Sequence, residues 1–204
     1  VYSVKHEILR DHKVEAIAAQ SSKDGKALCG DDYFFLVTED YFICVLADGL
    51  GSGEFAHESS RAVTDVVRES HGEDIDLLMD LCNQVLLQKR GAAVAIFKVY
   101  FKEKRFRYSC VGNIRFYLYP PNGKLVYPLP VTGYMSGRKQ RFHTQEFSYV
   151  PNSRFLIHSD GFEMRGTKDF FGLSSSLEVS ANQLEQTNSA ASDEITFIFG
   201  SLLV

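Results

Sequence analysis

At residues 43–53 the chain reads ICVLADGLGSG, five apolar residues followed by an aspartate and a run rich in glycine. The apolar half is typical of a buried β-strand, which we expect over residues 41–47. Asp48 is then the residue at which this strand ends, and Gly49 allows the chain to turn. Beyond it, apolar residues recur at helical spacing over 54–69, with Ser52 as the expected N-cap. The stretch therefore leads from a strand into a helix.

Strand patterns dominate the rest of the chain. A second helical stripe begins at Ile75 and is expected to stop before Gly91, and a weaker helical pattern lies within 174–186. Asn122-Gly123 indicates a hairpin turn. The remaining segments read as strands: 15–21, 33–37, 92–101, 106–111, 114–119, 142–150, 154–158 and 195–204. This pattern predicts one α+β domain spanning residues 1–204, with mainly antiparallel sheets packed together and covered by helices.

Composition narrows the class of protein and of partner. The chain has 204 residues, a net charge of −4 and four cysteines, with no spacing typical of a zinc site. The basic residues around Phe106 and Tyr108 alternate with those rings as the outer face of a strand would, so we expect no nucleic-acid surface. No signal-peptide pattern and no apolar run of about 20 residues is present. The expected location is therefore the cytoplasm, with no membrane partner.

Acidic residues fall where predicted strands begin or end. Asp48 and Asp160 each follow an apolar run and precede a glycine, whereas Asp31, Asp32 and Asp193 stand just before strands. Any one of them could simply form a turn. Several together could converge at one rim of a sheet, where carboxylates 4 Å apart repel by roughly 4 kcal/mol at an effective dielectric near 20. Such a cluster favours hard divalent cations such as Mg²⁺ or Mn²⁺.

The order of short motifs resembles the PP2C-type (PPM) metal-dependent protein phosphatases. The match runs from about residue 14 to the C-terminus, and residues 29–31 (CGD), the short chain and residues 127–130 (YPLP) are similar to the stressosome phosphatases within that family. The motifs that carry the resemblance are GD at 30–31, LADGLGSG at 46–53, VGNIR at 111–115, SDG at 159–161 and DEIT at 193–196.

The resemblance implies an α-β-β-α sandwich with two Mn²⁺ or Mg²⁺ ions at one end. In the family pattern Asp48 bridges both ions and positions the attacking water. Asp160 and Asp193 complete one metal site, and Asp31 with the backbone carbonyl of Gly49 completes the other. Asp32 is the rival of Asp31 for this role, and register with the short-form relatives favours Asp31.

The chain departs from the larger relatives at three positions, Leu50, Asn113 and Lys26. Leu50 stands where many relatives have a histidine thought to protonate the leaving group, so general-acid assistance must come from elsewhere or be weak. His57 is expected on the surface of a helix instead. Asn113 replaces an aspartate of a third metal site and could equally be a turn residue. Lys26 occupies the place of a phosphate-binding arginine, and is either a phosphate contact without the bidentate fork or a solvated loop residue. His158 is expected to line the core.

The resemblance implies direct hydrolysis of phosphoserine or phosphothreonine in a protein. The expected substrates are phosphorylated STAS-domain proteins of a stressosome, which would reset a bacterial stress signal. One alternative is a SpoIIE-like phosphatase that acts on a soluble anti-sigma-factor antagonist. Another is a non-catalytic binding module on a degenerate phosphatase fold, against which the retained carboxylates argue.

Overall fold

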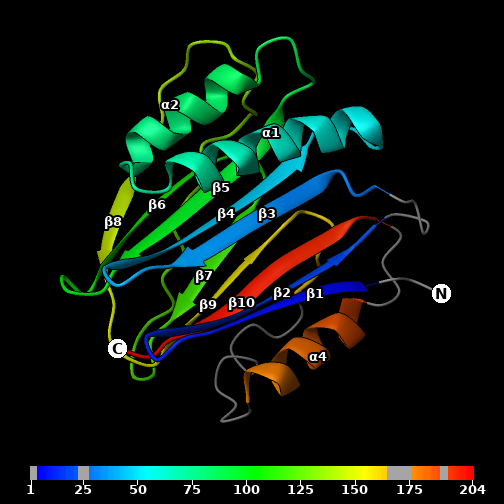
Figure 1. The fold of residues 1–204 in the computed structure, drawn as a ribbon. Coiled ribbons are helices and arrows are strands. Elements are labelled where there is room, and N and C mark those ends of the chain that lie inside the picture. The colour runs from blue at the N-terminus through cyan, green and yellow to red at the C-terminus, as the bar shows by residue number, and fades with distance from the viewer. Residues whose placement is uncertain (1–3, 23–27, 165–175, 189–192) are drawn as a thin grey trace.

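The computed structural model describes residues 4–22, 28–164, 176–188 and 193–204. Within these residues two five-stranded sheets stack face to face, with helices on both outer faces (Figure 1). One sheet has the order β1 (Val4–Arg10), β2 (Val14–Ser21), β10 (Ile195–Leu202), β9 (Ser153–His158), β7 (Arg115–Tyr119). The other has the order β3 (Asp31–Val37), β4 (Tyr41–Gly49), β5 (Ala92–Tyr100), β6 (Arg105–Val111), β8 (Gln145–Ser148). Neighbouring strands in both sheets pair antiparallel.

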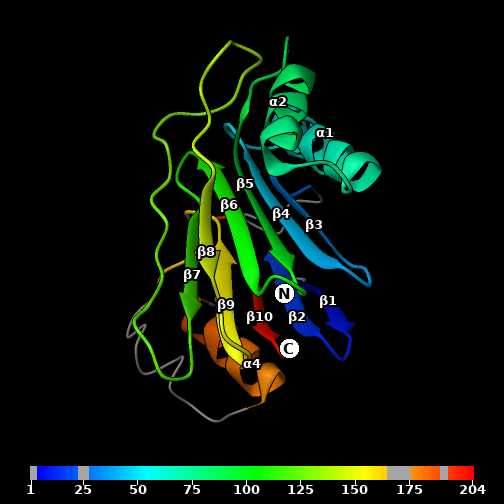
Figure 2. The same ribbon diagram turned by 90° about the vertical axis from the view of Figure 1, so that its left-hand side faces the viewer.

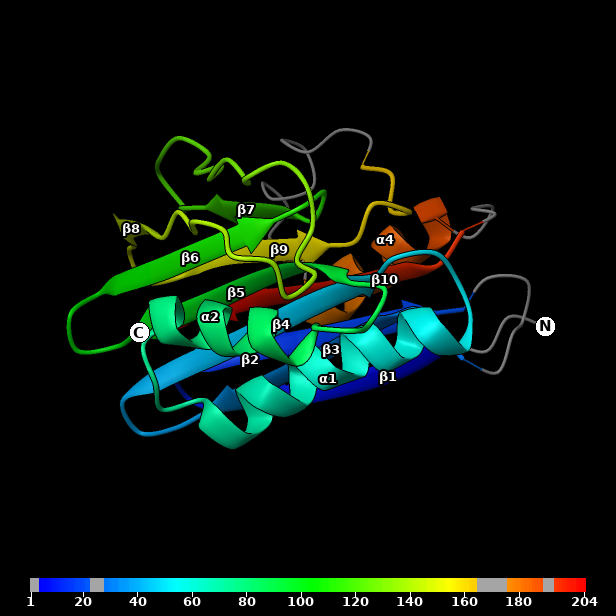
Figure 3. The same ribbon diagram turned by 90° about the horizontal axis from the view of Figure 1, so that it is seen from above.

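The helices complete a four-layer arrangement. Helix α1 (Glu54–Ser70) packs on β3 and β4, and α2 (Ile75–Val85) lies beside α1 over β5 and β6. Helix α4 (Leu177–Asn188) covers β2 and β10 on the opposite side. Figure 2 shows these layers after a quarter turn, and Figure 3 shows α1 and α2 lying over their sheet. The α+β class and the sandwich expected from the sequence are confirmed.

Strand β4 shows why its sequence is a continuous apolar run. Phe42, Cys44 and Leu46 point between the two sheets, whereas Ile43, Val45 and Ala47 point towards the helices. Successive side chains of a strand alternate between faces, and both faces of β4 are covered. All six residues are fully buried.

Aromatic rings fill the centre between the sheets. The Phe97 ring lies 4.7 Å from Phe116, 5.1 Å from Phe155 and 5.2 Å from Phe106. These rings come from strands of both sheets, so they lock one sheet against the other. Truncating one such ring to alanine typically costs about 3–5 kcal/mol.

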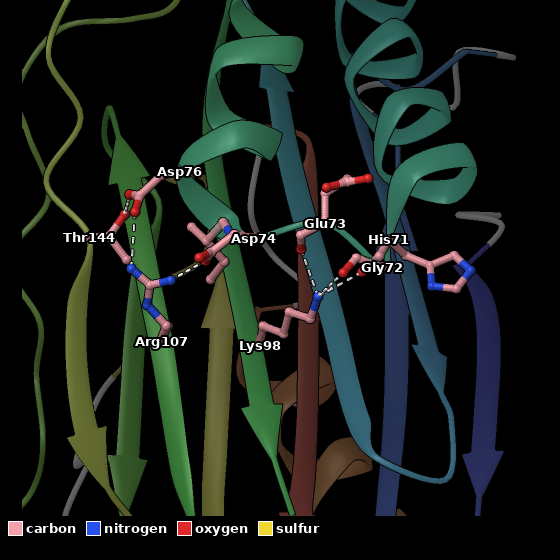
Figure 4. A network of polar contacts seen from close by, with 9 residues as sticks. His71, Gly72, Glu73, Asp74, Asp76, Lys98, Arg107 and Thr144 are labelled. Carbon is pink, nitrogen blue, oxygen red and sulfur yellow. Dashed lines mark hydrogen bonds and ion pairs between the residues drawn. The ribbon is translucent and has the colours of Figure 1, made fainter.

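A polar network fixes the connection between α1 and α2 (Figure 4). Lys98 of β5 is only 2% exposed, and its Nζ donates to the backbone oxygens of His71 (2.8 Å), Gly72 (3.3 Å) and Glu73 (2.7 Å). Arg107 of β6 pairs with Asp74 and Asp76. The ammonium group thus takes up carbonyls that would otherwise lack partners at the end of a helix.

Several boundaries differ from the sequence expectation. Strand β1 was not expected, and its residues are almost all exposed, so no apolar alternation marks it. The strand predicted over 142–150 is confined to Gln145–Ser148, and α2 ends at Val85. The N-cap of α1 is Gly53, with a φ of 77° and no side-chain cap bond, so the Ser52 prediction was wrong. No helix among the described residues has the length and apolar character needed to cross a membrane.

Candidate metal centre

A cavity of about 180 Å³ opens at one end of the sandwich. It lies where β3 begins, β4 ends and the β9 and β10 strands meet, so residues far apart in sequence share its walls. Its lining residues are Asp31, Asp48, Gly49, Leu50, Gly51, Ala93, Asn113, Asp160, Asp193 and Glu194. The five predicted metal ligands are therefore all brought to one place.

Antiparallel register places the first two carboxylates. Asp31 is the direct partner of Asp48 across the β3–β4 pair, and Asp31 is only 2% exposed. The next residue points to the other face of the strand. Accordingly Asp32 does not line the cavity but accepts a hydrogen bond from Thr64 of α1 at 2.5 Å. The geometry thus favours Asp31 over its rival.

Glycines let three chain segments meet beside Asp48. The amide of Gly49 donates to the carbonyl of Gly30 at 3.0 Å. A Cβ at Gly49 would lie 2.0 Å from the backbone oxygen of Ala56, so the first turn of α1 packs directly on the end of β4. Side chains at position 49 are excluded by this contact with α1.

Ser159 and Thr196 hold the other two carboxylates in place. The Ser159 amide donates to the Thr196 carbonyl at 2.9 Å, and the Thr196 amide donates to the Ser159 hydroxyl at 3.0 Å. These bonds join the residues next to Asp160 and close to Asp193. Both serine and threonine are fully buried.

Asn113 contacts a predicted ligand directly. Its amide Nδ2 donates to Oδ2 of Asp160 at 2.6 Å. Asn113 follows β6 and Asp160 follows β9, so this bond crosses between the two sheets. An amide in this position orients the carboxylate without adding negative charge.

Crowded negative charge dominates the electrostatics of the cavity. Burial raises the pKa of Asp48 well above its usual range, and the neighbouring Asp31 and Asp160 carboxylates raise it further. Burial also raises the pKa of Asp31, although hydrogen bonds from Ser159 and Thr196 oppose that shift. In the absence of cations, these shifts favour the protonated form of Asp48.

The residues fit hard divalent cations. Oxygen atoms are the only donors that these side chains offer, and Oδ2 of Asp31 is buried with no hydrogen-bond partner. In the described parts of the chain, no three acidic, histidine or cysteine side chains already form a ready-made ligand cluster. Asp160 is turned to Asn113 and Asp48 to Asp31.

Glu194 was not expected at the site. It lines the cavity, and its Oε2 accepts a hydrogen bond from the Gly30 amide at 2.8 Å. A Cβ at Gly30 would lie 2.6 Å from that same oxygen, so a larger residue there would displace the Glu194 carboxylate from this position. In the sequence, only the position of Glu194 next to Asp193 in the DEIT motif indicated that it lies at the site. Glu194 thus ties the start of β10 to the loop that presents Asp31.

The other singled-out residues have distinct positions. Leu50 lines the cavity and offers no proton. His57 is not among the lining residues; its Nδ1 donates to the Cys29 carbonyl at 2.9 Å. His158 is buried beside Tyr117 and Phe162, and burial lowers its pKa to about 4. Lys26 lies outside the described residues.

Comparisons with known proteins agree on the family. The model of Stage II sporulation protein E (SpoIIE) matches residues 38–199. Phosphoserine phosphatase RsbX of Bacillus subtilis (strain 168) is 37% identical over 196 residues, which cover 96% of this chain and 98% of that protein.

Solved structures show the same relationship. The crystal structure of RsbX in complex with magnesium has a TM-score of 0.93 and 36% identity, covering 97% of this chain and all of that one. A structure described as "The bacterial stressosome: a modular system that has been adapted to control secondary messenger signaling" has a TM-score of 0.83. It is 22% identical and covers 92% of this chain and 99% of that one, which shows a shared fold.

Proposed function

This chain belongs to the SpoIIE family of PP2C-type phosphatases, and we propose that it dephosphorylates serine or threonine in STAS-domain proteins of a stressosome. It is a metal-dependent protein serine/threonine phosphatase. The observation that carries the proposal is one acidic cavity lined by every carboxylate that the family pattern requires.

Each lining group has a proposed role. Asp48, at the centre of the mutually repelling carboxylates, would be shared between the divalent ions and would help to position the water that they activate. Asp31 and the Gly49 carbonyl would hold the ions from one wall of the cavity, and Asp160 with Asp193 from the other. Asn113 orients Asp160, and Glu194 holds the Asp31 loop in place.

The reaction is hydrolysis of a phosphate monoester. Divalent ions supply an activated water and neutralise charge on the phosphoryl oxygens when they are bound. The oxygen of water forms a bond to phosphorus while the bond from phosphorus to the serine or threonine oxygen breaks, which releases inorganic phosphate. Leu50 offers no proton to the departing oxygen, so that proton comes from another group or from solvent, and general-acid assistance worth about 10²–10⁴-fold is not supplied at this position.

The finer substrate assignment rests on similarity to one relative. The 37% identity extends over almost the whole of a phosphoserine phosphatase, and the short-chain motifs around Asp31 match the stressosome branch. The SpoIIE family match favours a second candidate, a soluble phosphorylated anti-sigma-factor antagonist.

Two measurements test these statements. We expect hydrolysis of p-nitrophenyl phosphate with Mg²⁺ or Mn²⁺, its loss on chelation, and a fall of at least about 10³-fold in Asp48→Asn. Asp80→Asn, the same change on the exposed face of α2, is the matched control. Activity that survives in Asp48→Asn would contradict the assigned centre. Competing phosphorylated stressosome STAS proteins against a phosphorylated anti-sigma-factor antagonist then decides the substrate by the ratio of kcat/KM.

A further inference from the structure

The cavity has a positive group at its rim that the proposed chemistry has not used. Arg90 lies in the turn between α2 and β5, and its side chain is exposed. A Cβ on Gly51, which lines the cavity, would lie 2.6 Å from Nη1 of Arg90. The guanidinium therefore sits directly against the glycine-rich loop that follows Asp48.

Contacts on both sides hold Arg90 in this position. Its guanidinium lies over the ring of Phe55 at 5.1 Å, a stacking arrangement that suits a planar cation. The Leu50 amide donates to the Gly91 carbonyl at 3.0 Å, which ties the residue after Arg90 to the same loop. Phe55 itself is 59% exposed, so the pair faces solvent. A guanidinium held this way loses little freedom when it binds a ligand.

Within the described parts of the chain, Arg90 forms no ion pair. No carboxylate among the described residues pairs with Arg90, whereas the adjacent Lys89 pairs with Glu58 at 2.5 Å. The carboxylates in the cavity oppose the approach of an anion. A phosphoryl group entering there is stabilised by positive charge in addition to that of the metal ions, and the fork of an arginine matches phosphate oxygens.

We propose that Arg90 is a substrate-binding residue that contacts the phosphoryl oxygens of the incoming phosphoserine or phosphothreonine. Phe55 supports it by fixing the plane of the guanidinium. This assignment rests on the proposed phosphatase function, and adds the anion-binding side of the same site. It places a phosphate contact on the α2–β5 turn.

Inorganic phosphate provides a probe that does not depend on turnover. With the metal-loaded protein, we expect Arg90→Ala to weaken phosphate binding by about 10- to 100-fold in calorimetry, the loss typical of a charged hydrogen bond. KM for p-nitrophenyl phosphate should rise by a similar factor. Arg90→Lys should recover part of the affinity, and Phe55→Ala should lose less than Arg90→Ala. Lys89→Ala, which removes the neighbouring charge, should match the wild type.

The outcomes separate this proposal from the phosphatase function itself. Unchanged phosphate affinity in Arg90→Ala overturns it. A rise in KM for phosphoprotein alone, with unchanged phosphate affinity, also overturns it, because Arg90 would then contact protein rather than phosphate. A wild type that binds phosphate through Arg90 but never hydrolyses an ester would instead overturn the proposed function. Equal metal affinity in Arg90→Ala and wild type excludes an indirect effect on the ions.

Discussion

Charged side chains lie at both ends of the β4–β5 pair, but their surroundings differ. At one end Lys98 is buried, yet its ammonium donates to three backbone carbonyls, and the neighbouring Arg107 is paired with two aspartates (Figure 4). At the other end Asp48 faces Asp31 with no basic side chain among the described residues lining the cavity. Ala93, beside Asp48, and Lys98 are five residues apart, about 17 Å along the strand. The Lys98 end stabilises the fold, whereas the Asp48 end provides carboxylates that can bind ions.

The largest effect on stability should come from disrupting the Lys98 network. Lys98→Ala leaves the carbonyls of the α1–α2 connection without their donor and removes a buried aliphatic stem. We expect the free energy of unfolding to fall by about 3 kcal/mol in urea titrations. Phosphatase activity of the Lys98→Ala variant, measured at a low temperature where it is folded, should stay near that of the wild type. A loss below about 1 kcal/mol would show that the network contributes little.

The crowded carboxylates around Asp48 should make the stability of the protein depend on pH. The pKa of Asp48 is raised in the folded protein, so the folded state binds more protons than the unfolded one between about pH 4 and pH 9. Stability of the metal-free protein that comes from this proton is present below about pH 4 and is lost as pH rises towards 9. Thermal unfolding in a chelator should therefore show a Tm that falls across this window. Asp48→Asn should flatten the slope, and so should Mg²⁺; an identical slope in Asp48→Asn would contradict the assignment.

The smallest effect should come from a change that leaves the carboxylates alone. Leu50→His places an imidazole at the cavity wall but removes no oxygen ligand. We expect metal affinity within about twofold of the wild type by calorimetry, because the ligand set is unchanged. Destroyed metal affinity would show that Leu50 is wrongly placed beside the site. Any gain in kcat would show that protonation of the leaving oxygen limits the rate in the wild type.

Much of the site could be predicted because strand ends are visible in sequence. The apolar run before Asp48 stops at a polar residue, and the run before Asp160 does the same. The sandwich and its class followed from the density of such runs. Asp31 could not be separated from Asp32 by composition; the choice depends on which face of β3 each residue occupies.

Features that depend on three-dimensional contact were not predictable. Glu194 acts through the amide of Gly30, which is 164 residues away along the chain. Lys98 reads as one charge in an apolar strand, and only the carbonyls above it explain its burial. Strand β1 lacks alternation because it is an edge strand exposed along nearly its whole length. Local pattern carries no information about such distant partners.

The bond between Ser159 and Thr196 has an evolutionary consequence. It joins the end of β9 to the start of β10, so the spacing of Asp160 and Asp193 is set by two short hydrogen-bonded strands. Related enzymes can therefore differ in the length of the chain between those aspartates while retaining the carboxylate positions, provided that α4 keeps its packing on β2 and β10.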